Sequence, residues 1–169
     1  MEAISSRAKT PGPPPSGGRI GGGWVARLVE VLQPVTVRAD RLGSMELFAG
    51  LRWSELEFAA GLFQEAEVDR GTRMTVQGRP TSRLYLITEG EALVSADARP
   101  IRVASTGEPI GVAGMLYGIN SRETTIALSP IRALAAEAIQ FQELTRHRSI
   151  RVRLTLAAGD QLRARRLRR

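Results

Sequence analysis

Short β-type runs separated by glycines occupy residues 64–137 and constrain the fold more than any other feature of the chain. Glycines at 71, 78, 90 and 107 mark turns, because glycine adopts positive φ with little steric cost. The runs are Ala66–Val68, Met74–Val76, Leu84–Ile87, Ala92–Ser95 and Ile101–Val103, followed by TTIALS (124–129) and IRALAAEAI (131–139) on either side of the Ser129–Pro130 turn. Short strands at this spacing predict a small antiparallel β-roll, jelly-roll-like in its arrangement.

Helical patterns precede this β-type region. Apolar residues recur at helical spacing over Trp24–Leu32 until Pro34, so we expect a short helix there. Residues 44–63 predict two further short helices. Ser54 and Glu57 have the spacing of a capping box, in which each side chain binds the backbone N–H of the other.

Helical patterns also follow the β-type region. We expect a short helix over 141–147 and a longer one over 149–168. An apolar stripe runs along the longer segment through Ile150, Leu154, Ala157 and Ala158, with Leu162 close to its continuation. The alternation in IRVRLTL (150–156) is also compatible with a strand, and Gly159 could mark a bend or a close approach.

The chain therefore divides into four segments. Residues 1–23 are rich in Pro, Gly and Ser and predict a disordered leader, because they carry too little apolar surface to fold alone. A short helix and linker are expected over 24–44, the β-roll with its helices over 45–147, and a basic C-terminal helix over 148–169. The expected fold is mainly β with flanking helices.

Composition excludes several classes of protein. There is no cysteine and a single histidine, His147, so thiolate and multi-histidine metal sites are excluded. No nucleophile is spaced with His147, and we expect no enzyme. The leader lacks the apolar core of a secretory signal and no apolar run reaches membrane-spanning length, so we expect a cytoplasmic protein without a membrane partner.

The net charge of +7 is unevenly distributed. Residues 1–45 carry six basic against three acidic residues (+3), residues 46–143 carry nine against thirteen (−4), and residues 144–169 carry nine against one (+8). A domain built to bind nucleic acid would be basic on its folded part, so nucleic acid is not the expected partner. The arginines of RARRLRR (163–169) are expected to form a solvated helix end.

The order of the motifs resembles the cyclic-nucleotide-binding domain of catabolite activators and of cAMP-dependent kinase regulatory subunits. The resemblance covers roughly residues 45–162 and is carried by LFAGL (47–51), EVDRGT (67–72), LYLITEG (84–90), GEPIG (107–111) and TTIALSPIRALA (124–135). Six glycines, at 71, 78, 90, 107, 111 and 118, fall in register. The resemblance implies that the β-roll is of the cyclic-nucleotide-binding type. It also implies that the ligand is a cyclic nucleotide, cAMP or cGMP, with no other cofactor. The transcription-factor members carry a helix-turn-helix domain that we do not expect in this chain.

The resemblance also implies a phosphate-binding cassette, defined here as residues 111–125. Gly111 matches its first glycine, and Arg122 matches the arginine that pairs with the cyclic phosphate. Backbone N–H groups of the Gly111–Ala113 turn would support the phosphate. Thr124 and Thr125 would line the pocket.

Two positions depart from the family pattern. Val112 replaces the glutamate that accepts the ribose hydroxyl, and Glu123 replaces a small residue beside the phosphate. If buried, a ribose hydroxyl without an acceptor weakens binding by about 1–3 kcal/mol. Glu123 could turn outward, or it could pair with Arg122 and close the pocket. On the latter reading, Glu123→Ala or Val112→Glu should improve binding.

Two functions follow from these features. The first is a non-enzymatic sensor of a cyclic nucleotide that relays binding through its C-terminal helix to a protein partner or a second copy. The second is a degenerate module that keeps the roll without binding nucleotide and serves protein interaction or assembly. Plain alternatives exist for single residues: Arg122 could be a loop arginine paired with Glu123, and the threonines could stand at a strand start for β-propensity alone.

Overall fold

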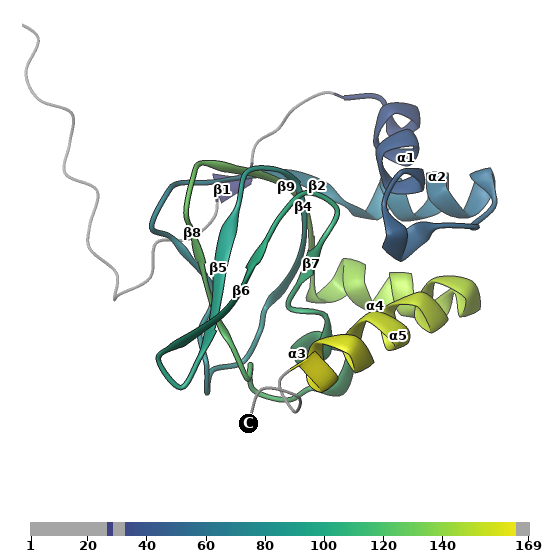
Figure 1. Ribbon diagram of the computed structural model, residues 1–169. Helices are drawn as coiled ribbons and strands as arrows, with labels where there is room; N and C mark the ends of the chain where they lie inside the picture. The colour runs from purple at the N-terminus through teal and green to yellow at the C-terminus, as the bar shows by residue number, and fades with distance from the viewer. Residues whose placement is uncertain (1–26, 29–32, 165–169) are drawn as a thin grey trace, which may run out of the picture.

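The computed structural model of the chain describes residues 27–28 and 33–164. Helices gather on one side of a β-roll (Figure 1). The strands are β1 (Arg27–Leu28), β2 (Gln64–Val68), β3 (Arg73–Thr75), β4 (Arg83–Glu89), β5 (Ala92–Ala96), β6 (Arg99–Ala104), β7 (Pro109–Ile110), β8 (Thr124–Ala127) and β9 (Ile131–Glu137). The helices are α1 (Val35–Gly43), the 3₁₀ helix η1 (Glu46–Phe48), α2 (Trp53–Leu62), α3 (Val112–Tyr117), α4 (Ala138–Arg146) and α5 (Arg148–Ala164).

Two antiparallel sheets form the roll. One has the strand order β1-β2-β9-β4-β7 and the other β3-β8-β5-β6. The predicted antiparallel roll with flanking helices is confirmed, and each of the seven expected β-runs overlaps a strand. The strand β7 was not expected. It pairs with β4 through Tyr85 and Ile110 and through Leu86 and Pro109, and so fixes the start of the cassette against the centre of the sheet.

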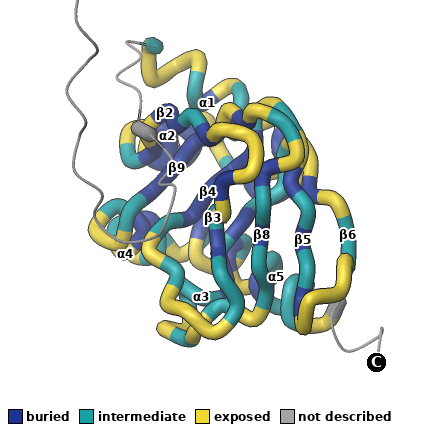
Figure 2. The backbone as a smooth tube through the Cα atoms, turned by 90° about the vertical axis from the view of Figure 1, so that its left-hand side faces the viewer, coloured by how far each residue is buried: buried dark blue, intermediate teal, exposed yellow. Residues whose placement is uncertain are grey.

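The strands β4 and β9 are buried on both faces because helices cover one face and the roll covers the other. Successive side chains of a strand point to opposite faces. Leu84 and Leu86 accordingly pack in the helical core, whereas Tyr85 and Ile87 pack inside the roll. In Figure 2 this central pair is the most continuously buried part of the roll. A continuous apolar run such as LYLI therefore marks a strand with two buried faces.

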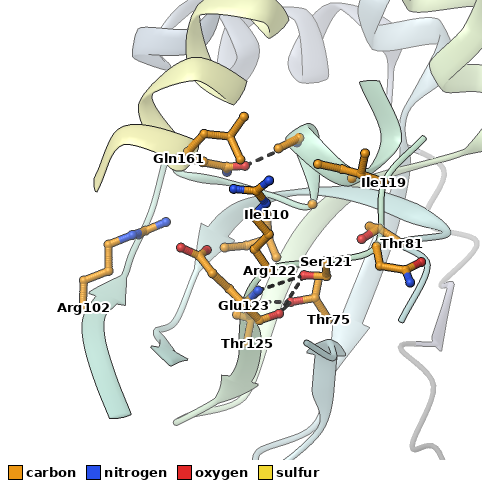
Figure 3. Close-up of a pocket in the computed structure, with 15 residues that line it drawn as sticks. Thr75, Thr81, Arg102, Ile110, Ile119, Ser121, Arg122, Glu123, Thr125 and Gln161 are labelled. Atoms are coloured by element: carbon orange, nitrogen blue, oxygen red, sulfur yellow. Dashed lines mark hydrogen bonds between the residues drawn. The ribbon is translucent and has the colours of Figure 1, made fainter. Parts of the chain in front are cut away.

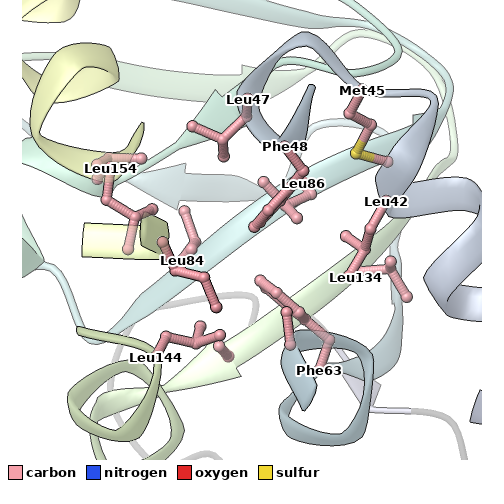
Figure 4. Close-up of a cluster of buried hydrophobic side chains, with 14 of the residues drawn as sticks. Leu42, Met45, Leu47, Phe48, Phe63, Leu84, Leu86, Leu134, Leu144 and Leu154 are labelled. Carbon is pink, nitrogen blue, oxygen red and sulfur yellow. The ribbon is translucent and has the colours of Figure 1, made fainter. Parts of the chain in front are cut away.

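The helical core joins the N-terminal helices to α4 and α5. Figure 4 shows it with Leu42, Met45, Leu47, Phe48, Phe63, Leu84, Leu86, Leu134, Leu144 and Leu154 converging between the helices and the sheet. Phe48 and Phe63 meet edge to face, with ring centroids 6.2 Å apart. Leu154 is fully buried, so the middle of α5 is fixed to the core.

The expected helix over Trp24–Leu32 is wrong where the structure describes it. Arg27–Leu28 forms β1, which pairs with the edge of β2. Residues 24–26 and 29–32 lie outside the described residues, as does the expected leader at 1–23. Pairing along the open edge of a sheet satisfies the backbone N–H and C=O groups of this segment. An isolated helix of this length would be only marginally stable.

The segment expected to be a linker before residue 44 contains α1. Pro34 is the residue before its first turn, where a missing N–H costs nothing, so this proline begins a helix rather than ending one. Ala39 and Leu42 are fully buried. Their packing outweighs the low helix propensity of the β-branched residues at the start of α1.

Two smaller expectations need correction. The capping interaction of α2 is formed two residues earlier than expected, because the backbone N–H of Arg52 donates to the Glu55 carboxylate at 2.8 Å. The C-terminal helix is confirmed as one helix up to residue 164, with its expected apolar stripe facing the core, and residues 165–168 of the expected helix lie outside the described residues. It runs through Gly159 without interruption, and a Cβ added there would meet only the Arg163 guanidinium, at 3.5 Å.

Candidate functional site

The cassette starts with a glycine that the geometry requires. Gly111 has a φ of 92°, and an added Cβ would lie 2.7 Å from the carbonyl oxygen of Arg83 and 2.8 Å from Thr81 Cγ2. No other residue type satisfies both conditions without strain. The close approach fixes the turn between β7 and α3 against the beginning of β4.

The far end of the cassette is held by backbone hydrogen bonds to the turn between β3 and β4. The N–H of Gly78 donates to the carbonyl of Ser121 at 2.8 Å, and the N–H of Ser121 donates to the carbonyl of Arg79 at 2.8 Å. The Ser121 hydroxyl donates to the carbonyl of Glu123 at 2.7 Å. The loop that carries Arg122 is therefore braced on both sides.

A small pocket lies between these two ends of the cassette and α5. Its volume is about 40 Å³, and its walls include Gly111, Ala113, Arg122, Glu123 and Thr125. Five of the seven residues expected to form a site are therefore brought together. Figure 3 shows the Arg122 side chain extending into this pocket from the loop before β8.

Arg122 makes no hydrogen bond or ion pair that the described part of the chain shows, and none joins it to Glu123. In Figure 3 the Arg122 guanidinium points toward α5, whereas the Glu123 carboxylate points toward the side of the pocket where Arg102 lies. Of the two alternatives for Glu123, the carboxylate therefore turns away from Arg122 and does not pair with it. Arg102 pairs instead with Glu108.

The other two expected site residues lie outside the pocket walls. Val112 is fully buried in the helical core. The Thr124 hydroxyl accepts a hydrogen bond from the backbone N–H of Gln77 at 3.0 Å and so joins β8 to the residues after β3. Thr125 is buried and hydrogen-bonded to Thr75 at 3.0 Å.

The burial of Val112 bears on the expectation that Val112→Glu should improve binding. A glutamate at this position would direct its carboxylate into the core next to α5 rather than toward a ribose. An unpaired carboxylate in an apolar core is strongly destabilising. Val112→Glu is therefore expected to damage the fold and not to improve binding.

Sequence reasoning missed several residues of the pocket, of which Thr81 and Gln161 bear most on its chemistry. The Thr81 hydroxyl oxygen is buried at the pocket wall and has no hydrogen-bond partner in the described part of the chain. A buried hydroxyl without a partner costs free energy unless a ligand or a water satisfies it. The glycines at 111 and 114 are the sequence signal that could have pointed to a close contact here. The lack of a Cβ at both positions leaves room for the Thr81 side chain.

Gln161, near the end of α5, is the second of these residues. Its Nε2 donates to the carbonyl of Pro109 at 2.8 Å, and its Oε1 accepts from the backbone N–H of Ala113 at 3.4 Å. The side chain thus bridges the residues before and after Gly111. Nothing in the sequence signals this contact, because it joins residues 48 and 52 positions apart.

A buried carboxylate lies at the junction of α4 and α5. Glu55 of α2 is 3.9 Å from Nδ1 of His147, the residue between the two helices. The backbone N–H of Arg52 lowers the pKa of Glu55 to about 2, aided by hydrogen bonds from Ser149 and from the Arg52 side chain and opposed by burial. The start of α5 is therefore tied to α2 by an ionised group.

Residues 27–28 and 33–164 contain neither a cluster of metal-binding side chains nor a membrane-spanning helix. No cluster of three or more His, Asp or Glu residues in that part of the chain could hold a metal ion. None of the described helices is long and apolar enough to cross a membrane.

No protein-family model and no curated protein sequence matches the chain, but solved structures do. The cAMP-bound PfPKA-R (141–441) has a TM-score of 0.69 at 15% identity, over 77% of this chain and 45% of that chain. A putative cyclic nucleotide-binding protein from Geobacter metallireducens has a TM-score of 0.63 at 18% identity, over 75% of this chain and 96% of that one. A cAMP-binding acyltransferase from Mycobacterium smegmatis has a TM-score of 0.57 at 27% identity, over 79% of this chain and 43% of that chain.

These likenesses show that the chain has the fold of the cyclic-nucleotide-binding domain, as the sequence motifs indicated. The chain spans less than half the length of PfPKA-R (141–441) and of the acyltransferase.

Proposed function

We propose that this chain, with its cyclic-nucleotide-binding fold, is a regulatory module that binds the phosphate of a cyclic nucleotide at the cassette. Arg122 would pair with the phosphate, and backbone N–H groups of the Gly111–Ala113 turn would donate to it. A guanidinium with additional oriented donors is the chemistry that a phosphate group requires. The ligand would be cAMP or cGMP, without a further cofactor or metal and without enzymatic chemistry by this chain.

One observation carries this proposal. An arginine without a partner among the described residues lines the same small pocket as a buried Thr81 hydroxyl that also lacks one. A guanidinium and a hydroxyl left unsatisfied together indicate a place where an anion with several oxygen acceptors would be stabilised. A purely structural arginine in a braced loop would be expected to pair with a neighbouring carboxylate.

The departures from the family pattern bear on affinity. With Val112 in the core, no carboxylate of the turn accepts a ribose hydroxyl, so binding is expected to be weaker by about 1–3 kcal/mol than in a pocket with that acceptor. Glu123 adds a negative charge at the pocket wall. Both features favour a weak or atypical site.

Relay of binding would pass through α5. This helix touches the cassette through Gln161, and it is fixed to the core through Leu154 and tied to α2 near Ser149. A ligand that displaced the end of α5 would alter a surface that a protein partner or a second copy of the chain could recognise. We place this activity in the cytoplasm.

Calorimetry with cAMP and cGMP tests the proposal. We expect saturable binding by the full chain, and a loss of tenfold to about a hundredfold in affinity in Arg122→Ala, because hydrogen bonds to charged groups contribute about 1.5–3 kcal/mol. Arg70→Ala is the matched control, since Arg70 is exposed in the turn between β2 and β3. Equal affinities for the two variants would exclude Arg122 as the phosphate ligand.

A second function is favoured by a different observation. The pocket holds about 40 Å³, whereas small-molecule sites usually enclose about 300–1,000 Å³. A module that keeps this pocket closed permanently would use the roll for protein interaction or assembly. The absence of any thermal shift at millimolar cAMP and cGMP would favour this second function.

A further inference from the structure

We infer that Gln161 is an internal latch that holds the end of α5 against the cassette and occupies the backbone donor that a bound phosphate would use. This inference concerns the regulation of the proposed site and rests on the proposed function. The contacts of Gln161 would account for the small volume of the cassette pocket.

The contacts of Gln161 are matched to the turn around Gly111. The carboxamide uses its donor on the Pro109 carbonyl at 2.8 Å and its acceptor on the Ala113 N–H at 3.4 Å. The first hydrogen bond is short and the second is long. The long one engages the N–H that the proposed function assigns to the phosphate, and a charged oxygen would replace the amide oxygen favourably there.

The pocket cannot admit a nucleotide while the latch is closed. Its volume of about 40 Å³ is far below the size of a ligand site, and Gln161 and Leu162 of α5 form part of its wall. Withdrawal of the end of α5 would remove these two residues from the wall and enlarge the pocket.

The latch side chain has room to move. A neighbouring cavity of about 420 Å³ lies on the other side of Gln161, between α5, η1 and the turn before β7. Its walls include Leu47, Leu156 and Asp160, and Gln161 and Arg102 are shared with the cassette pocket. The carboxamide could turn into this space without disturbing the core.

The last turns of α5 are held by the partly buried Leu162, which packs against the helical core, and by the contacts of Gln161. Leu154 and Ala158 are fully buried, but Asp160 and Arg163 form only an exposed ion pair with each other. Such a pair contributes little. Among the described residues beyond Ala158, Gln161 supplies the hydrogen bonds that join α5 to the cassette. Opening can thus be confined to the end of the helix.

Hydrogen–deuterium exchange of the full chain without ligand tests the latch. Gln161→Ala should accelerate exchange of the Ala113 amide and of the last turn of α5 about fivefold to thirtyfold, the effect of losing one or two hydrogen bonds of about 1 kcal/mol each. Gln142→Ala is the control, because it removes the same type of side chain from an exposed position on α4. Unchanged exchange in Gln161→Ala would refute the latch, whatever the ligand does.

Calorimetry with cAMP on the same variants tests competition with the phosphate. Gln161→Ala should bind cAMP about fivefold to thirtyfold more tightly than the unsubstituted chain. Accelerated exchange with weaker binding would show that Gln161 contacts the ligand, and would refute the competition. Accelerated exchange with no binding by any variant would support the latch and refute the proposed cyclic-nucleotide site.

Discussion

Gly111→Ala is the substitution that most directly tests how the cassette is positioned. A Cβ at this residue meets two obstacles: a φ of 92°, and contacts of 2.7 Å with the Arg83 carbonyl oxygen and 2.8 Å with Thr81 Cγ2. The first costs about 1–2 kcal/mol for a residue other than glycine. The second forces the turn away from β4 and costs about 1–3 kcal/mol, the usual range for overpacking.

Gly107→Ala separates the two terms. Gly107 has nearly the same φ, 88°, but nothing lies within 4 Å of an added Cβ. It should therefore lose only the conformational term. The expected difference between the variants is the packing term alone, about 1–3 kcal/mol, or about 2–12 °C in Tm for a chain of this size.

Thermal unfolding followed by circular dichroism at constant pH measures this difference. We expect Gly111→Ala to have the lower Tm and to bind cAMP more weakly, because the turn that carries the Ala113 N–H shifts. Gly107→Ala should keep its affinity. Equal Tm values for the two variants would refute the packing of the cassette turn against the start of β4.

Three other substitutions test separate parts of the structure. Thr81→Val should stabilise the ligand-free chain by about 1 kcal/mol in urea unfolding, because it removes a buried hydroxyl without a partner among the described residues. The same substitution should weaken cAMP binding. Destabilisation of the ligand-free chain would show that the hydroxyl is satisfied. Val112→Glu should lower the free energy of unfolding by more than about 3 kcal/mol, and a stable variant would place this side chain outside the core. The carboxylate of Glu55 has a pKa lowered from 4.5 to about 2, so its stabilisation is complete above pH 4.5 and is lost as the pH falls toward 2. The Tm of Glu55→Gln should accordingly fall less than that of the unsubstituted chain between pH 5 and pH 2, and parallel curves would contradict this.

The β-roll was predictable because each of its signals is local. Turn glycines and short apolar runs are read directly from neighbouring residues, and the motif spacing adds the order of the strands. β7 escaped prediction because Pro109–Ile110 is too short to show a period. The helix α1 escaped because its first residues favour a strand locally, and only the burial of Ala39 and Leu42 against the core stabilises it.

The cassette was predictable in outline and not in its contacts. Spacing placed Gly111 and Arg122 at the two ends of one loop, and both residues line the same pocket in the structure. The apolar side chain of Val112 favours the core over a polar pocket, and the structure buries it there. The contact of Gln161 depends on how α5 crosses the sheet, so it required the tertiary structure.

Titration of the ¹⁵N-labelled full chain with cAMP, followed by amide chemical shifts, tests most directly whether the cassette is the binding site. We predict saturable shifts centred on the amides of Ala113 and Arg122, with smaller shifts along the end of α5, all lost in Arg122→Ala and retained in Arg70→Ala. Shifts confined to the neighbouring cavity beside Leu47 and Leu156, or no shifts at millimolar cAMP, would contradict phosphate binding at the cassette.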